Sequence, residues 1–357
     1  MAYTTIDDPS AHFQIDLYTG SGSAKTFDGN SDLQPDMVWI KARSTAEKTR
    51  IADSSRGVGD GTDETKWMVV QDAGTEESST EFTSINSDGF TLNSSDAKLN
   101  SGSHTYVAWA WKANGGTRVT FTESGDNPAG GHSANTTAGF SVVDYTGTGD
   151  NGTVAHGLGA APDVIILKCR SDAHDWQVGH DSIASDAWTD YLNPNTTGAA
   201  ADYYGHWNDT APTSTVFSLG DNTGLNGDGR TFIAYCFTPI QGYSKFGTYT
   251  GNGNADGPFV YTGFKPAWVL IKKSSSTGSW TILDIKRGAS YGENDHTLKT
   301  NGADAEYTSE NFLGFMSNGF KFEGTNGDVN ADAAKYVYMA FAHQPFVTSG
   351  GVPCTAR

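Results

Sequence analysis

The chain has 357 residues, of which 18% are charged and 12% aromatic, and its formal net charge is −18 at pH 7. This charge argues against a nucleic acid partner, because binding DNA or RNA requires clustered Lys and Arg that displace counterions, and it disfavours an anionic membrane surface for the same reason. The length allows about two or three domains, and no stretch approaches the roughly 18 apolar residues of a membrane span.

Three copies of one sequence block follow each other along the chain. Their shared elements are a Tyr-Thr-Gly-x-Gly opening, a Pro followed by an apolar run, and a second apolar run near the end of each copy. The opening lies at 18–22, 145–149 and 249–253, the first run at 35–41, 162–168 and 266–272, and the second at 106–111, 232–237 and 336–341. A repeat of this length predicts three similar domains, each large enough to bury its own core. One continuous core through all three, or a mainly helical structure, would contradict this prediction.

The predicted fold class is all-β, with three tandem β-sandwich, jelly-roll-like repeat domains. Gly recurs every few residues and few segments have a helical period, so short strands joined by turns are expected. A parallel β-helix is the rival, but its short regular repeats are absent. The predicted parts are an N-terminal docking tail (1–12), repeat one (13–112), a linker (113–138), repeat two (139–240), repeat three (241–346) and a C-terminal tail (347–357).

In chain order, the tail at 1–12 is polar and becomes ordered only by docking on something. Residues 37–40 are apolar at every position, so this strand is expected between two layers and not at a sheet surface. Residues 106–111 have the same character. The linker contains one short predicted strand at 118–122. The short join at 238–246 predicts that the second and third domains pack closely.

Two acid–base pairs recur at the same place in two copies, namely Asp53 with Arg56 and Asp284 with Arg287. Their spacing suits a bidentate ion pair. The middle copy has His180 in place of the acid, and a catalytic carboxylate would rarely be duplicated and then lost from one copy. We interpret the pairs as structural, with sugar binding as the alternative. The recurring Gly-x-Gly is interpreted as a turn, because no helix follows it to complete a phosphate cradle.

Aromatic residues of the second and third copies are the candidate ligand contacts. Trp176 and Trp280 occupy aligned positions, where either a core residue or a platform for a sugar ring would fit. A second group lies in the most divergent loop region, where aromatic and polar residues on a rigid sandwich commonly present a binding surface. This group consists of Tyr203, Tyr204, His206, Trp207 and Asn208.

Metal and catalytic signatures are absent from the sequence. Cys169, Cys236 and Cys354 have unrelated spacings, so buried free thiols are expected and no disulfide framework. The remaining candidates match neither a zinc signature nor a calcium loop, and no nucleophile elbow is present. These candidates are His174, His180 and His206, and the acidic turns at 221–229 and 326–330. We predict no catalytic residue, no metal, no cofactor and no enzymatic activity.

The composition is typical of proteins exposed outside cells, with little Lys and much Gly, Ser, Thr, Asn, Tyr and Trp. The first residues nevertheless have neither the basic segment nor the apolar run of a secretory signal. A virion component, assembled in the host cytoplasm and released by lysis, would reconcile both features.

Several motifs resemble a repeat-domain family of tailed-phage virion proteins, common in marine phages and cyanophages. These motifs lie at 249–253, 259–269, 317–321 and 338–342, with further similarity at 2–10 and 211–218. The resemblance covers nearly the whole chain and implies a tail-fibre or lectin-like protein, for which symmetric trimers are usual. It supplies no functional residues.

The sequence therefore predicts a non-enzymatic phage virion protein, a tail-fibre or receptor-binding component that engages host surface glycans, with affinity raised by multivalency. Its expected partners are other virion proteins, further copies in a trimer, and a host cell-surface glycan. Two alternatives stay open. One is a purely structural head-decoration, tail or baseplate protein, and the other is a polysaccharide depolymerase, which would need a pair of carboxylates across a groove.

Overall fold

The computed structural model describes residues 2–28, 33–56, 65–93, 95–183, 188–288, 296–308 and 312–353. These residues form antiparallel sheets almost throughout, with two α-helices of four residues each and one short 3-10 helix, η1 (Pro9–Ala11). The all-β prediction is confirmed. Within these ranges, no helix has the length and apolar character needed to cross a membrane.

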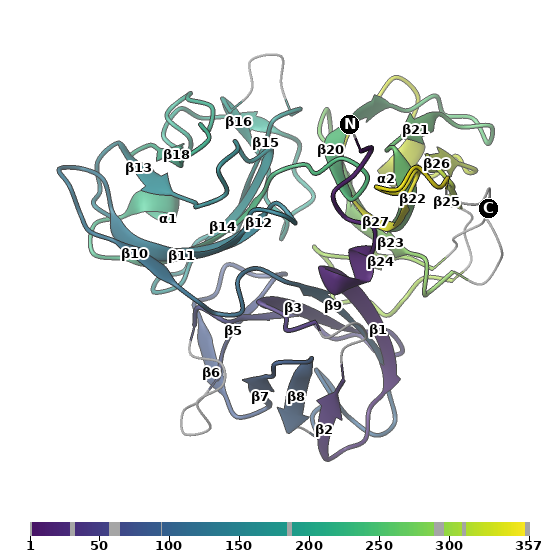
Figure 1. Ribbon diagram of the computed structural model, residues 1–357, viewed down its shortest axis with the longest axis horizontal. Coiled ribbons are helices and arrows are strands. Elements are labelled where there is room, and N and C mark those ends of the chain that lie inside the picture. The colour runs from purple at the N-terminus through teal and green to yellow at the C-terminus, as the bar shows by residue number, and fades with distance from the viewer. Residues whose placement is uncertain are drawn as a thin grey trace.

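The strands fall into three groups that form three lobes around a common centre (Figure 1). The first unit contains β1 (Phe13–Thr19), β2 (Ala24–Phe27), β3 (Met37–Ala42), β4 (Arg50–Asp53), β5 (Thr65–Val69), β6 (Glu77–Ser79), β7 (Phe82–Ile85), β8 (Phe90–Asn93) and β9 (Thr105–Trp111). The second contains β10 (Val119–Phe121), β11 (Ala129–Asn135), β12 (Phe140–Thr146), β13 (Gly152–Ala155), β14 (Val164–Cys169), β15 (Gln177–His180), β16 (Asp190–Tyr191), β17 (Ala201–Asp202), β18 (Val216–Leu219), α1 (Thr223–Asn226) and β19 (Thr231–Phe237). The third contains β20 (Ser244–Thr250), β21 (Phe259–Tyr261), β22 (Phe264–Lys273), β23 (Trp280–Asp284), β24 (Leu298–Lys299), β25 (Leu313–Met316), β26 (Gly319–Phe322), α2 (Gly327–Asn330) and β27 (Lys335–Pro345).

The same strand order occurs in the three large sheets. It is β1-β9-β3-β4 in the first unit, β12-β19-β14-β15 in the second and β20-β27-β22-β23 in the third. A smaller sheet accompanies each one, namely β2-β8-β7, β13-β18 and β21-β26-β25. These elements fall on the positions that the sequence aligns.

The central strands of each large sheet are buried on both faces, as predicted for residues 37–40. In β3, Val38 and Ile40 belong to the core between the two sheets of the first unit. Met37 and Trp39, on the opposite face, belong to a core that all three units share. Because side chains alternate along a strand, one apolar run supplies both cores.

The shared core corrects the expectation of three independent interiors. It runs through all three units, and aromatic rings meet at its centre, where Trp268 lies 5.6 Å from Trp111 and 5.8 Å from Phe341. Separate local cores exist in the first and second units, whereas the interior of the third is continuous with the shared core. The three sandwiches therefore form one packed body. The sequence pattern did not indicate this, because a strand buried between two layers does not reveal which chain segment supplies the second layer.

The predicted linker at 113–138 is also corrected. It contains β10, near the predicted strand at 118–122, and β11, a strand of seven residues that pairs along its whole length with β12. Small and polar residues make β11 look like a loop in sequence. It nevertheless extends the second sheet because β12 offers it a full ladder of hydrogen bonds.

The N-terminal tail docks on the third unit of the same chain. The Tyr3 hydroxyl donates to the Gly263 carbonyl at 2.7 Å, and the Ser349 amide donates to the Asp7 carboxylate at 2.6 Å. Ile6 is 3% exposed and belongs to the shared core. The tail thus connects the first unit to the third and closes the ring of units.

The recurring Tyr-Thr-Gly-x-Gly block is a turn held by a buried asparagine. In the second unit, Tyr145 donates to the Leu225 carbonyl at 2.5 Å, and Asn226 accepts from the Thr148 amide at 3.0 Å. A Cβ at Gly147 would lie 2.5 Å from the Gly227 carbonyl oxygen, so only Gly fits there. The same contacts join Tyr18 to Leu99, Asn100 to Ser21, Tyr249 to Val329 and Asn330 to Asn252.

Candidate functional site

Three of the predicted ligand contacts are core residues. Trp176 is fully buried and donates from Nε1 to the Val69 carbonyl of the first unit at 2.9 Å. Trp280 is 3% exposed and donates to the Asn193 carbonyl of the second unit at 2.9 Å. Trp207 is 1% exposed in the local core of the second unit. A ring without exposed faces offers no stacking surface, so Trp176 and Trp280 follow the core alternative, and the prediction of all three tryptophans as ligand contacts is wrong.

The Asp–Arg pairs are structural, as predicted, and they join neighbouring units. Asp53 and Arg56 are fully buried and 2.6 Å apart, and the Tyr235 hydroxyl of the second unit donates to Asp53 at 2.6 Å. Asp284 and Arg287 form the same pair at 2.5 Å, with Trp109 of the first unit as the donor. Every group of these pairs bonds to protein, which leaves no face for a sugar.

We call the interface between two units a seam. His180 occupies the aligned position at the third seam, between the second and third units. Its Nε2 donates to the Tyr338 carbonyl of the third unit at 3.2 Å, and its Nδ1 accepts from the Ser182 amide at 3.0 Å. Burial lowers its pKa to about 4, so the ring is neutral at pH 7. A neutral histidine here needs no buried arginine, which explains why the middle copy lacks the ion pair.

A buried lysine also crosses each seam. Lys41 donates to the Ala303 carbonyl at 2.7 Å, Lys168 to the Ala73 carbonyl at 3.2 Å, and Lys272 to the Thr197 carbonyl at 3.1 Å. Each lysine thus donates to a neighbouring unit. The Asp or His of that neighbouring unit contacts the lysine's own unit at the same seam. Burial lowers the pKa of each ammonium to about 8.

The remaining aromatic candidates, Tyr203, Tyr204 and His206, lie together with Tyr191 near the surface of the second unit. We call these four residues the tyrosine cluster. Tyr203 and Tyr204 are 41% and 55% exposed, with ring centroids 5.4 Å apart. His206 is 3% exposed and lies beneath them, stacked on Tyr191 at 3.8 Å and 11°. Burial lowers the pKa of His206 to about 4. The neutral ring is fixed by Gln177, whose Oε1 lies 3.1 Å from Nε2.

Two aspartates and an asparagine lie in or beside the loop that holds the tyrosine cluster. A Cβ at Gly205 would lie 2.7 Å from the Tyr203 ring and 2.8 Å from the Asp221 carboxylate, so both groups lie close to this glycine. Asp202 is also exposed next to Tyr203. Asn208 accepts a hydrogen bond from Asn151 at 3.0 Å in a left-handed conformation with φ 52°. Exposed rings beside acceptor oxygens match the apolar face and the hydroxyl groups of a sugar.

A second exposed aromatic pair lies on the third unit, at a strand where we predicted no site. Phe259 and Tyr261 on β21 are 48% and 49% exposed, and the Tyr3 hydroxyl lies 3.5 Å from that of Tyr261. The signal in the sequence is the alternation Phe-Val-Tyr. The central residue, Val260, is buried and its two aromatic neighbours are exposed. This alternation alone does not predict a site, because aromatic residues in a strand are more commonly part of a core.

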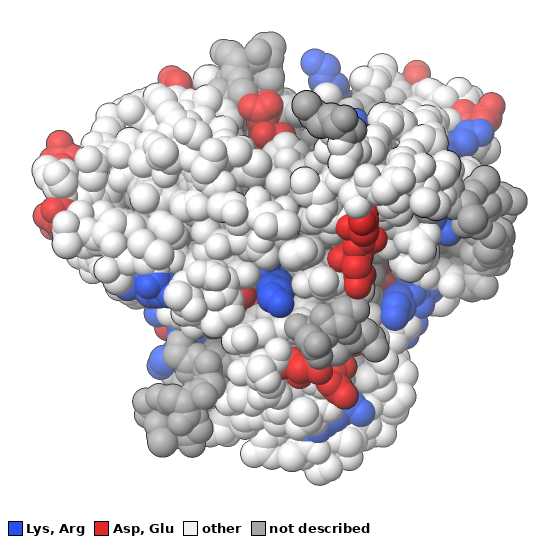
Figure 2. Space-filling view, in the orientation of Figure 1, with Lys and Arg blue, Asp and Glu red and all other residues white. Residues whose placement is uncertain are grey.

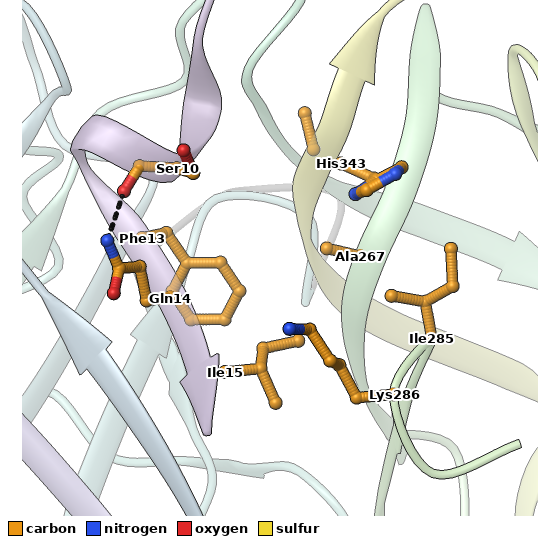
Figure 3. A pocket seen from close by; sticks show the side chains of 9 residues that line it. Ser10, Phe13, Gln14, Ile15, Ala267, Ile285, Lys286 and His343 are labelled. Atoms are coloured by element: carbon orange, nitrogen blue, oxygen red, sulfur yellow. Dashed lines mark hydrogen bonds between the residues drawn. The ribbon is translucent and has the colours of Figure 1, made fainter. Parts of the chain in front are cut away.

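One pocket of about 130 Å³ lies between β1 and the third unit (Figure 3). Its walls are mainly hydrocarbon, from Phe13, Ile15, Ala267, Ile285 and Ala342, with Lys286 and His343 as the titratable groups. The Gln14 amide is turned to the Ser10 carbonyl, to which it donates at 2.9 Å. Among the described residues the lining contains no carboxylate, and it suits a small apolar molecule better than a polar sugar ring.

The metal and cysteine candidates have structural surroundings. Cys169 and Cys236 are buried and unpaired, as predicted, whereas Cys354 lies outside the described residues. The acidic turns contain the short helices α1 and α2, capped by the side chains of Asn222 and Asn326. Over the described ranges, no group of three or more His, Cys, Asp or Glu is arranged to hold a metal.

Fold and surface together define an all-β protein of three sandwiches closed into one body, with exposed aromatic clusters on two units. The chain belongs to the family described as domain of unknown function DUF7483, whose model matches residues 8–345. The match spans all three units. No curated protein and no solved structure matches the chain significantly.

Proposed function

We propose that this protein is a phage virion component that binds host-surface glycans without chemical turnover. The observation that carries this proposal is the tyrosine cluster. Tyr203 and Tyr204 expose their rings on a surface whose deeper residue, His206, is fixed by stacking and by Gln177. A site held rigid before binding loses little conformational entropy when the ligand arrives.

The surface supports recognition of neutral sugars at this cluster. Asp202 and Asp221 accept hydrogen bonds from sugar hydroxyls and would repel acidic sugars. On the face of the molecule shown in Figure 2, charged side chains are scattered among wide uncharged areas. Such a surface favours contacts through polar and aromatic groups over contacts through charge.

The closed body also favours a structural role in a particle. Three seams held by buried polar contacts would give a stiff unit for assembly with other virion proteins or with further copies in a trimer. A receptor-binding component must in addition project outward from the particle. Locating the chain in intact phage by labelled antibodies would separate a receptor binder from an internal tail or baseplate protein.

The proposal is tested by glycan-array binding and by adsorption of the purified protein to host cells. The double variant Tyr203→Ala/Tyr204→Ala is expected to lose at least about tenfold in affinity, because stacking contributes on the order of 1 kcal/mol per ring. Tyr307→Ala, which removes a 41% exposed tyrosine from the third unit, is the matched control. Equal binding by all three proteins would remove the tyrosine cluster from the proposal, and absence of any glycan binding would remove the function.

A further inference from the structure

The outer face of the small sheet in the third unit has a second aromatic surface with a different charge. We call it the β21 face and define it by Tyr3, Lys245, Phe259 and Tyr261. Phe259 and Tyr261 alternate with the buried Val260, so both project from the same side of an edge strand. The Cα atoms of residues i and i+2 in a strand, such as Phe259 and Tyr261, lie about 7 Å apart.

A glycine on the neighbouring strand leaves space beside one end of this face. Tyr261 is opposite Gly319 on β26, whereas Phe259 is opposite Lys321. A Cβ at Gly319 would lie 2.9 Å from the Phe259 ring, so the ring covers the glycine. An exposed aromatic ring beside a glycine suits the flat face of a pyranose ring.

Lys245 gives the β21 face a positively charged group. The Lys245 ammonium lies 5.2 Å from the centre of the Tyr261 ring and donates to the Tyr261 carbonyl at 2.8 Å. Among the described residues it has no carboxylate partner. Lys321, in contrast, is paired with Asp256 at 2.5 Å. Lys245 therefore makes this face locally positive, although the net charge of the chain is −18.

We propose that the β21 face binds acidic polysaccharide, with a uronic acid ring stacked on Phe259 and Tyr261 and its carboxylate paired with Lys245. The hydroxyls of Tyr3 and Tyr261 lie at the edge of the surface, 3.5 Å apart, within reach of sugar hydroxyls. The inference rests on the proposed glycan-binding function and names the substrate class. It also gives the chain two sites of opposite charge preference, because two aspartates lie in or beside the loop that holds the tyrosine cluster.

Affinity electrophoresis and calorimetry with alginate and polygalacturonate as acidic probes, and dextran as the neutral probe, test the proposal. The wild type is expected to bind an acidic probe more tightly than dextran at the β21 face, and less tightly as salt increases. Lys245→Gln should weaken this binding about tenfold and remove most of its salt dependence. Phe259→Ala/Tyr261→Ala should abolish it. Lys25→Gln, which removes a lysine placed over Phe27 in the first unit, is the matched control.

Several outcomes would overturn the inference. No binding of either acidic probe by a folded wild type does so, as does equal binding by the wild type and the Phe259→Ala/Tyr261→Ala variant. Self-association of the wild type that this variant loses would make the face a contact between copies. Unfolding midpoints of every variant establish that the proteins are folded. Because the tyrosine cluster is assayed separately with neutral glycans, failure at the β21 face leaves the test of the proposed function intact.

Discussion

The indole nitrogen of Trp109 donates a hydrogen bond to the carboxylate of Asp284 at 3.0 Å, although the two residues lie 175 positions apart in different units. Tyr235, at the aligned position of the second unit, donates to Asp53 of the first at 2.6 Å. At the last seam His180 reaches the backbone of Tyr338. The first unit donates to the third and the second unit donates to both others, so these three contacts link every pair of units without one common direction.

The first prediction concerns the Asp284 carboxylate. Asp284→Ala leaves Arg287, which is 1% exposed, without its main counter-charge. Removing one partner of a buried ion pair costs about 3–5 kcal/mol, so the free energy of unfolding should fall by that amount in urea titrations. Asp96→Ala, in the exposed pair with Lys98, should cost less than about 1 kcal/mol. A similar small loss for both variants would contradict the structural role of the buried pair.

The second prediction concerns acid stability and His180. Its pKa is about 4 in the folded protein and 6.5 as the ordinary value, so the unfolded chain binds the proton more tightly. The contribution of neutral His180 to the free energy of unfolding is therefore fully present above pH 6.5. It is lost as the pH falls from 6.5 towards 4. The loss from this residue amounts to about 3 kcal/mol.

His180→Gln removes this titration. The stability difference between wild type and variant should narrow as the pH falls from 7 to 4.5, measured by urea unfolding at constant ionic strength. Nδ1 already accepts from the Ser182 amide, so protonation must break that bond. A constant difference across this range would show that His180 keeps its ordinary pKa.

The third prediction concerns the asparagine clamps, the buried residues Asn100, Asn226 and Asn330 that hold the three Tyr-Thr-Gly-x-Gly turns. Asn226 is fully buried and accepts from the Thr148 amide, while its own amide donates to the Asp150 carbonyl. Asn226→Ala leaves these backbone groups unsatisfied at about 1–3 kcal/mol. Asn100→Ala and Asn330→Ala should have effects of the same size, because their contacts are equivalent. Asn195→Ala, at an exposed hydrogen bond with Asp175, is the control. A large effect at only one clamp would contradict the equivalence of the three turns.

Much of the fold could be predicted from the repeated block. The spacing of the Tyr-Thr-Gly-x-Gly turns and the apolar runs gave the strand-rich class and the burial of 37–40 on both faces. The sequence pattern was uninformative about the partner of the second face, since Trp39 would look the same beneath a helix, a loop or another sandwich. The β11 strand escaped prediction because its pairing depends on β12 and not on its own composition.

Only part of the candidate site could be predicted, because the sequence does not show which aromatic residues are exposed. Tyr203 and Tyr204 are exposed while Trp176, Trp207 and Trp280 are buried, and all five are aromatic residues near polar neighbours in sequence. Trp176 and Trp280 are buried where two units meet, whereas Trp207 is buried in the local core of its own unit. Trp176 and Trp280 align because each donates across a seam, so their recurrence reflects assembly and not ligand binding.

The last prediction concerns closure of the ring by the N-terminal tail. Ile6 places its side chain in the shared core, and Tyr3 and Asp7 fix the tail on the third unit through Gly263 and Ser349. Ile6→Ala should lower the free energy of unfolding by about 2–4 kcal/mol, because a buried isoleucine is replaced by a cavity.

Because the three units share one core, the unfolding transition of Ile6→Ala should remain a single step in calorimetry. Asp8→Ala is the control, since its carboxylate accepts hydrogen bonds from Ser10 in the local turn. Separate transitions for the first and third units in Ile6→Ala would mean that the tail holds together domains that are otherwise independent. A single transition at a lower temperature is expected, because the shared core couples the stability of each unit to that of its neighbours.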